Sequence, residues 1–268
     1  MAKQFSLAYL TVPGITPVEQ IRIAREAGYD YVSLRTIPMG LPGEPQICLE
    51  RDPEQFRVIR QMLKDCEMKL LDIELVRVRE DLPSDYSAAF ERGAELGATN
   101  VLSSVWTKDH AFAADRYGMI CEQAAQFGLT VNLEFPIVSG ITNLKDTIAL
   151  QDQVNMPNLK ILMDMIYVHW DGVTPEDIRA LDPSRFGLIH LCDCPKDMEG
   201  TEFIQIMREG RAYCGEGAVD VAGLVGALPE APCSIELPNT KRIAELGAAG
   251  HVARCLETAK AYFADKGM

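Results

Sequence analysis

Four short apolar runs in the second half of the sequence each carry one residue of a kind that binds metal ions. They are "VNLEF" with Glu134, "ILMDM" with Asp164, "LIHLCD" with His190 and "SIEL" with Glu236. Taken singly, such a carboxylate at a strand end caps a loop or forms a salt bridge. Three carboxylates brought together without basic partners would repel one another, and a divalent cation removes that repulsion. If the fold brings the four together, the sequence predicts one divalent metal site.

The chemistry of the same four side chains also limits which metal ions can bind. Carboxylate and imidazole groups are ligands for Mn²⁺, Mg²⁺, Co²⁺, Fe²⁺ and Zn²⁺, and the oxygen-rich set favours Mn²⁺ or Mg²⁺. "CDC" at 192–194 also looks like a metal-binding pair. Structural zinc is disfavoured there because the sequence has no second cysteine pair at zinc spacing.

The elements that would position these residues alternate between strand and helix along the chain. Apolar runs predict strands at 5–12, 29–36, 68–78, 98–106, 129–135, 159–166, 185–193 and 231–237. Helical patterns follow at 17–28, 53–67, 84–97, 114–128, 143–154, 174–182 and 249–267. Strand–helix alternation predicts a parallel sheet, and eight such units match the size of a (β/α)₈ barrel. We predict an α/β fold in which residues 1–268 form a single (β/α)₈ TIM barrel domain.

A barrel explains why polar residues close buried strands, because active sites of this fold lie at the C-terminal ends of the strands. The metal site is therefore expected at the ends of strands five to eight. A doubly wound open sheet is the alternative. The turn after its first strand usually carries a glycine-rich fingerprint, whereas "TVPGITP" has one glycine and nothing to cradle a pyrophosphate.

Composition excludes several classes of protein. The chain has 26 Lys and Arg against 39 Asp and Glu, a formal net charge of −13, without the basic cluster of a nucleic-acid binder. No apolar stretch reaches the roughly 18 to 20 residues of a membrane helix, and the N-terminus lacks a signal-peptide layout. The eight scattered cysteines then indicate reduced thiols in the cytoplasm.

These residues resemble the xylose isomerase-like barrels, also called the sugar phosphate isomerase/epimerase family, over nearly the whole chain. The resemblance implies that Glu134, Asp164, His190 and Glu236 bind one divalent metal ion. It also implies that the protein forms homo-oligomers. "RAYCGEG" is similar to the family's Arg-x-x-x-Gly-x-Gly segment, which implies that Arg211 contacts substrate.

One position departs from the family pattern. Many relatives carry a substrate-contacting histidine three residues after the aspartate of strand six, where "DMIYVHWDG" has Tyr167. Either Tyr167 supplies the hydrogen bond or His169 swings in to do so. A loop role for His169, packed on Trp170, is the third possibility. The departure makes strict ketose-epimerase activity less secure.

The pair of glutamates predicts the chemistry. A metal that chelates a ketone and its neighbouring hydroxyl acidifies the adjacent C–H bond. Glu134 and Glu236 would remove and return that proton through a metal-bound enediolate, giving a keto-sugar or polyol isomerase or epimerase. The alternative is a lyase that dehydrates a cyclic keto-polyol or keto-acid, of the inosose or 3-dehydroshikimate dehydratase kind. A non-catalytic or nucleic-acid-directed barrel is a third class, disfavoured by the acidic charge and the four histidines.

Several further residues are candidates for binding the substrate. Arg35, Arg77, Arg79 and Arg211 could meet a carboxylate or phosphate, because guanidinium groups suit both. Strict alternation puts Glu74 and Arg77 on opposite faces of their strand. Glu74 is a substrate-binding candidate, or it pairs structurally with Arg35. The 36–52 loop is long enough to act as a lid, and its apolar residues suit a cyclic substrate or pack on the barrel rim.

Overall fold

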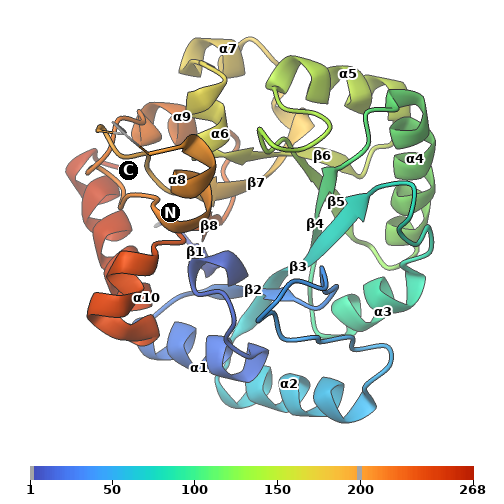
Figure 1. Cartoon of the computed structure of the whole chain (residues 1–268), viewed down its shortest axis with the longest axis horizontal. Coiled ribbons are helices and arrows are strands. Elements are labelled where there is room, and N and C mark those ends of the chain that lie inside the picture. Colours follow the sequence, from blue (N-terminus) through green and yellow to red (C-terminus); the bar gives the residue numbers. More distant parts are fainter. Residues whose placement is uncertain (1–2, 198–200) are drawn as a thin grey trace.

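Eight parallel strands close into one barrel in the order β1 to β8, so the predicted fold is confirmed. The computed structural model describes residues 3–197 and 201–268. Figure 1 shows the strands around a central axis with the helices outside them. The strands are β1 (Phe5–Leu7), β2 (Tyr31–Arg35), β3 (Lys69–Val78), β4 (Asn100–Val105), β5 (Thr130–Glu134), β6 (Leu159–Asp164), β7 (Phe186–Leu191) and β8 (Cys233–Ile235).

Seven of the described helices lie where the sequence predicts them, and three short ones, at 165–170, 203–209 and 221–227, were not predicted. The described helices are α1 (Pro17–Ala27), α2 (Pro53–Asp65), α3 (Ser87–Glu95), α4 (His110–Gln126), α5 (Leu144–Val154), α6 (Met165–Trp170), α7 (Pro175–Arg179), α8 (Phe203–Glu209), α9 (Val221–Ala227) and α10 (Thr240–Asp265). None of the described helices is long and apolar enough to cross a membrane.

Helix α1 shows how local sequence sets these boundaries. The Thr16 side chain accepts a hydrogen bond from the backbone N–H of Glu19, and Pro17 occupies the first turn, where its missing N–H costs nothing. Gly28 ends the helix with φ at 90°, a left-handed conformation that favours glycine. The predicted buried stripe of Ile21, Ile23 and Ala24 is confirmed.

Some predicted strands extended too far. The 5–12 strand ends at Leu7, because Tyr9–Thr11 form a 3₁₀ turn at the barrel rim. The 159–166 strand ends at Asp164, whose side chain caps α6 by accepting from the backbone N–H of Ile166. A metal-ligand candidate thus lies where a strand passes into a helix.

The barrel interior is layered. Leu71, Leu102, Leu162 and Leu188 form an apolar cluster of their own, apart from the main core between strands and helices. In a polar layer the Ser33 hydroxyl lies 3.0 Å from that of Ser6 and 3.3 Å from that of Ser234, and it also donates to the buried carboxylate of Asp72. The charged candidate residues lie nearest the C-terminal ends of the strands.

Strand β3 changes register between Ile73 and Val76. Glu74 lies in register with Arg35, whereas Arg77 lies in register with Ser104, which is itself in register with Glu134. Residues in register on parallel neighbours face the same side. The expectation that Glu74 and Arg77 occupy opposite faces is therefore wrong, because the shift interrupts strict alternation.

Candidate metal centre

The four predicted metal ligands come together at one end of the barrel. Ligand atoms of Glu134 (β5), Asp164 (β6), His190 (β7) and Glu236 (just after β8) all lie within 4.8 Å of one another. Their residues are at most 7% exposed. Four consecutive strands supply one group each, because the C-terminal ends of parallel strands meet at the same rim.

Two atoms of this cluster indicate that a partner belongs between them. Glu134 Oε1 and His190 Nδ1 are buried and lack a hydrogen bond to any described residue. They lie 3.3 Å apart, and His190 Nδ1 lies 3.5 Å from Glu236 Oε2. Buried polar atoms are rarely left unpaired. A divalent cation that accepts carboxylate oxygens and one imidazole nitrogen fits this donor set.

The protonation equilibria of the cluster show how strongly its groups interact. Burial and the neighbouring Glu236 raise the pKa of Glu134 to about 7. Burial also opposes ionisation of Glu236, but the charges of His190 and Arg211 outweigh it and hold the pKa of Glu236 below its usual range. Burial lowers the pKa of His190, yet Glu236 and Glu134 outweigh it and raise that pKa. The site therefore favours one positive charge among its carboxylates.

Arg211 forms ion pairs with two of the predicted ligands. Arg211 comes shortly after α8, and its side chain is fully buried. Its Nη1 lies 2.8 Å from Asp164 Oδ2, and its Nη2 lies 3.0 Å from Glu236 Oε2. Nε donates to the backbone carbonyl of Met207 at 2.9 Å. The predicted contact of Arg211 with substrate stays a prediction, because the guanidinium is engaged with these protein oxygens.

The segment after Arg211 is held by Asp193, a residue that the sequence reasoning missed. Its carboxylate accepts backbone hydrogen bonds from Gly215 (3.0 Å), Gly217 (2.9 Å) and Val219 (2.9 Å). A Cβ at Gly217 would lie 2.1 Å from the Cys194 carbonyl oxygen. The Gly-x-Gly segment thus needs glycine at 217 because the chain passes so close to Cys194.

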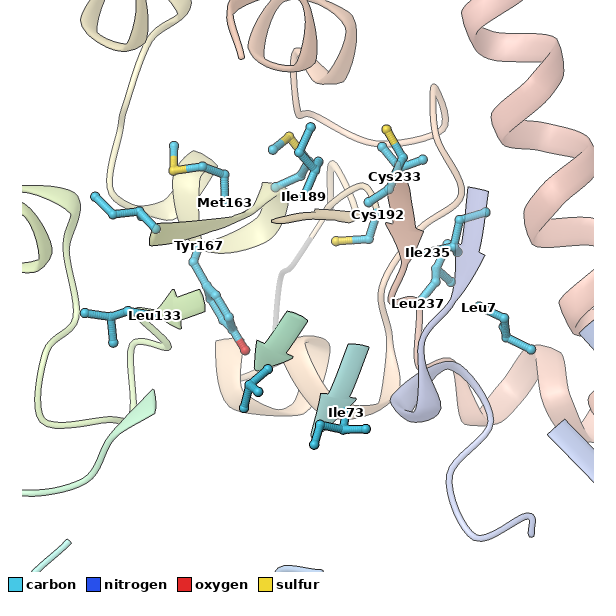
Figure 2. Close-up of a cluster of buried hydrophobic side chains, with 14 of the residues drawn as sticks. Leu7, Ile73, Leu133, Met163, Tyr167, Ile189, Cys192, Cys233, Ile235 and Leu237 are labelled. Atoms are coloured by element: carbon cyan, nitrogen blue, oxygen red, sulfur yellow. The ribbon is translucent and has the colours of Figure 1, made fainter. Parts of the chain in front are cut away.

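Tyr167, rather than His169, lies against the cluster. Arg211 Nη2 donates to the Tyr167 hydroxyl at 3.4 Å, and its guanidinium lies 5.6 Å from the ring centroid. In Figure 2 the side chains of Tyr167 and Cys192 point toward the barrel centre, whereas those of Leu133 and Met163 point outward. His169 lies in the last turn of α6, partly exposed, and its side chain forms no hydrogen bond or ion pair with the described residues.

The sequence profile of the xylose isomerase-like TIM barrel family matches residues 21–259. The chain belongs to this family. No curated protein matches the sequence. In this member of the family the four ligand candidates lie at the C-terminal ends of β5, β6 and β7 and just after β8.

Solved structures agree with this fold at low identity. A crystal structure of IolI protein with a bound zinc atom has 18% identity, a TM-score of 0.78 and 97% coverage of each chain. D-allulose 3-epimerase from Methylomonas sp. has 15% identity and a TM-score of 0.70, covering 98% of this chain and 100% of that one. The probable 3-DHS dehydratase AsbF from Bacillus anthracis has 17% identity and a TM-score of 0.69, covering 95% and 98%. These likenesses support the fold.

Arg35 at the end of β2 is enclosed by protein groups in this family member. Its guanidinium pairs with Glu74 at 2.9 Å, as one sequence interpretation expected, and with Glu44 at 3.0 Å. The ring of Tyr9 lies 4.6 Å from the guanidinium carbon. Contacts of Arg35 and Glu74 with substrate remain predictions, and the structure shows that each is bound to the other.

Glu44 anchors the 36–52 loop, and the sequence reasoning did not single it out. Besides Arg35, its carboxylate accepts the backbone N–H groups of Met39 (2.9 Å), Gly40 (2.8 Å) and Leu41 (3.2 Å). The side chain of Glu44 is only 3% exposed. The first part of the loop is thereby folded around one carboxylate at the rim of the barrel.

Cys192 and Asp72 are further residues near the cluster. The Cys192 thiol lies 3.6 Å from Asp164 Oδ1 and 3.4 Å from Arg211 Nη1, and burial and the Asp164 charge raise its pKa. Burial and the Glu74 charge raise the pKa of Asp72 to about 7. The alternation of Asp72 and Glu74 in "LLDIEL" was the available signal that both carboxylates face inward.

Proposed function

We propose that this protein is a divalent-metal-dependent isomerase or epimerase of a keto-sugar or related polyol. The observation that carries the proposal is the convergence of Glu134, Asp164, His190 and Glu236 within 4.8 Å. Glu134 and His190 also present unpaired buried atoms to each other. The oxygen-rich set favours Mn²⁺ or Mg²⁺, and Zn²⁺, Co²⁺ and Fe²⁺ are acceptable to the same ligands.

A cation bound here would polarise a substrate carbonyl and acidify the adjacent C–H bond. The chain itself supplies two carboxylates for moving the proton. Glu134 closes β5 and Glu236 follows β8, so two strands separate them around the barrel and they approach a bound substrate from different sides. One carboxylate accepts the proton from carbon to leave an enediolate. The proton is returned to the next carbon, or the other group, present as the carboxylic acid, donates its own proton to the opposite face.

Arg211 and Tyr167 position this machinery. The Arg211 guanidinium fixes Asp164 and Glu236 relative to each other through its two nitrogens. The Tyr167 hydroxyl accepts a hydrogen bond from Arg211, so its own proton remains available to a substrate oxygen. The protein encloses the reacting groups almost completely, which excludes water from the proton transfer.

A dehydratase of a cyclic keto-polyol or keto-acid is the second candidate, and Tyr167 is the observation that favours it. Burial raises the pKa of this phenol, so it keeps its proton across the neutral range. A protonated phenol at this position can donate to a departing hydroxyl on the carbon beyond the enediolate. The product then differs from the substrate by the loss of one water molecule.

Deuterium exchange tests the proposed chemistry. The protein loaded with Mn²⁺ would be incubated in D₂O with candidate ketoses, inososes and cyclic keto-acids. Deuterium at the carbon beside the carbonyl supports proton transfer, and its absence from every product contradicts the proposal. The product mass separates the candidates: an unchanged skeleton indicates isomerisation, and loss of one water indicates dehydration. Tyr167→Phe should abolish dehydration while leaving exchange measurable.

A further inference from the structure

Among the four arginines considered for binding a substrate anion, Arg77 differs from the others in its partners. Arg35 pairs with Glu74 and Glu44, and Arg211 pairs with Asp164 and Glu236. Arg79 is partly exposed and pairs with Asp81 at 2.5 Å. Arg77 donates through Nη2 to the carbonyl oxygen of Met39 at 3.0 Å and forms no ion pair within residues 3–197 and 201–268.

No carboxylate among the described residues forms an ion pair with Arg77, and the more distant charge of Glu44 only partly offsets its burial. Arg77 is half-buried, and burial together with the nearby Arg79 lowers its pKa. A partly desolvated guanidinium without a carboxylate is costly, and a planar anion with two oxygens satisfies it well. An arginine without a carboxylate partner is unusual in a chain with a net charge of −13.

Arg77 lies beside a cavity of about 380 Å³ at the rim of the barrel. The cavity combines an apolar wall, including Ile37, Leu75 and Tyr86, with the basic side chains of Arg51 and Arg77. Glu50 and Asp85 also line it. Glu50 Oε1 accepts from the Cys48 thiol while its buried Oε2 has no hydrogen-bond partner among the described residues, and Asp85 Oδ1 accepts from the backbone N–H of Ser87. Neither carboxylate pairs with Arg77.

None of the four proposed metal ligands lines the cavity, but strand register places Arg77 two strands from Glu134. Arg77 is in register with Ser104, and Ser104 is in register with Glu134. Two strand spacings separate the Cα atoms of Arg77 and Glu134 by about 10 Å. The two residues face the same side of the sheet, so a small substrate can extend from one to the other.

We propose that this cavity binds the anionic group of the substrate, a carboxylate or a phosphate, through the Arg77 guanidinium. The inference rests on the proposed function and narrows its substrate to an acidic keto-polyol or a phosphorylated sugar. Apolar wall residues contact the carbon skeleton beside the anion. The carbonyl end of the substrate then reaches Glu134 and Glu236.

Anion titration of the full-length chain tests this assignment. Inorganic phosphate and acetate would be added separately, with and without Mg²⁺, while the Nε–H resonance of Arg77 and the dissociation constants are measured by NMR. Arg77→Gln should weaken binding by about ten- to a hundredfold, the loss expected for a charge-assisted hydrogen bond. Arg79→Gln is the matched control, because Arg79 lies on the same segment but is paired with Asp81. Its effect should stay below about twofold.

A second variant guards against misfolding of the first. Ala89→Asp introduces a carboxylate into the cavity lining from α3 while Arg77 stays in place. This variant should abolish anion binding. Its melting temperature should stay near that of wild type, because no buried side chain is removed. Binding of phosphate alone assigns a phosphorylated substrate, and binding of acetate alone assigns a carboxylic acid. If neither anion binds, or if Arg77→Gln and Arg79→Gln weaken binding equally, the inference is wrong.

The same samples separate this inference from the proposed function. Wild-type protein that binds Mn²⁺ and exchanges deuterium into a neutral ketose, yet binds neither anion, contradicts the anion site alone. Protein that binds anions through Arg77 but fails to bind any divalent metal contradicts the proposed function alone. Metal affinity of Arg77→Gln should equal that of wild type, because Arg77 is not among the converging ligands.

Discussion

Arg211 Nη1 and Asp164 Oδ2 lie 2.8 Å apart with both side chains fully buried, and the same guanidinium lies 3.0 Å from Glu236. One cation of the protein therefore neutralises part of a three-carboxylate cluster before any metal arrives. Its geometry fixes two of the four proposed ligands. The stability of the protein and its affinity for metal should consequently depend on the same residue.

Replacing Arg211 with Gln should destabilise the metal-free protein by roughly 3 to 5 kcal/mol, because two buried carboxylates lose their partner. Saturating Mn²⁺ should recover part of the loss, since bound metal stabilises the folded state. Urea unfolding with and without Mn²⁺ measures both values. Arg208→Gln, an exposed arginine in the last turn of α8, serves as control. Equal destabilisation with and without metal would refute the coupling.

Glu44→Ala should loosen the first part of the 36–52 loop, because three backbone N–H groups and Arg35 lose a shared acceptor. Amide hydrogen exchange at Met39, Gly40 and Leu41 should accelerate at least tenfold, while exchange in the barrel strands stays unchanged. Glu44→Gln keeps an acceptor and should give an intermediate rate. Glu54→Ala, which removes an exposed side chain in the first turn of α2, is the control. Unchanged loop exchange in Glu44→Ala would show that other contacts hold the loop.

Asp72 predicts a pH dependence of stability. Its pKa is raised to about 7 in the folded state, from about 4 in an unfolded chain. Between about pH 4 and pH 7 the folded state binds more protons than the unfolded state. The contribution of Asp72 to the free energy of unfolding is therefore complete below about pH 4 and is lost as pH rises to about 7. Asp72→Asn should therefore gain stability over wild type between pH 5 and 7, by about 1 kcal/mol per unit. Denaturation at several pH values, with Asp85→Asn as control, should show this slope; a constant difference would contradict it.

Two glycine substitutions should have opposite effects on the free energy of unfolding. Gly217→Ala places a Cβ 2.1 Å from the Cys194 carbonyl oxygen and 2.2 Å from Asp193 Oδ1, so it should destabilise by about 2 kcal/mol or more. Gly118→Ala lies within α4 with nothing within 4 Å, and should stabilise by about 0.5 to 1 kcal/mol. Thermal unfolding of both variants checks the pair. A neutral Gly217→Ala would show that the 211–219 segment adapts.

The fold and the ligand cluster could be predicted because their signals are periodic. Most strands are long enough to show an apolar run, and the three-residue strands β1 and β8 lie within longer apolar runs. A polar residue that closes such a run is conspicuous once the barrel is assumed. Glu134 and Glu236 were found in this way. Helices α8 and α9 were missed, since seven residues give too little periodicity to identify a helix.

The remaining features depend on contacts between distant segments. The face of Arg77 follows from a register shift in β3, which strict alternation does not reveal. Pairing of Arg35 with Glu44 depends on the path of the 36–52 loop, and Asp193 binds backbone groups more than twenty residues away. Such contacts follow from loop paths and backbone spacing, for which the sequence has no short-range pattern.

Metal affinity of the wild type beside single ligand variants tests the central claim most directly. Wild-type protein freed of metal should bind one equivalent of Mn²⁺ by calorimetry, whereas Glu134→Ala and Glu236→Ala should lose at least tenfold in affinity. Glu122→Ala, at an exposed position of α4, should leave the affinity unchanged. Equal Mn²⁺ binding by all four proteins, or no binding by wild type to Mn²⁺, Mg²⁺, Co²⁺, Fe²⁺ or Zn²⁺, would contradict the metal centre.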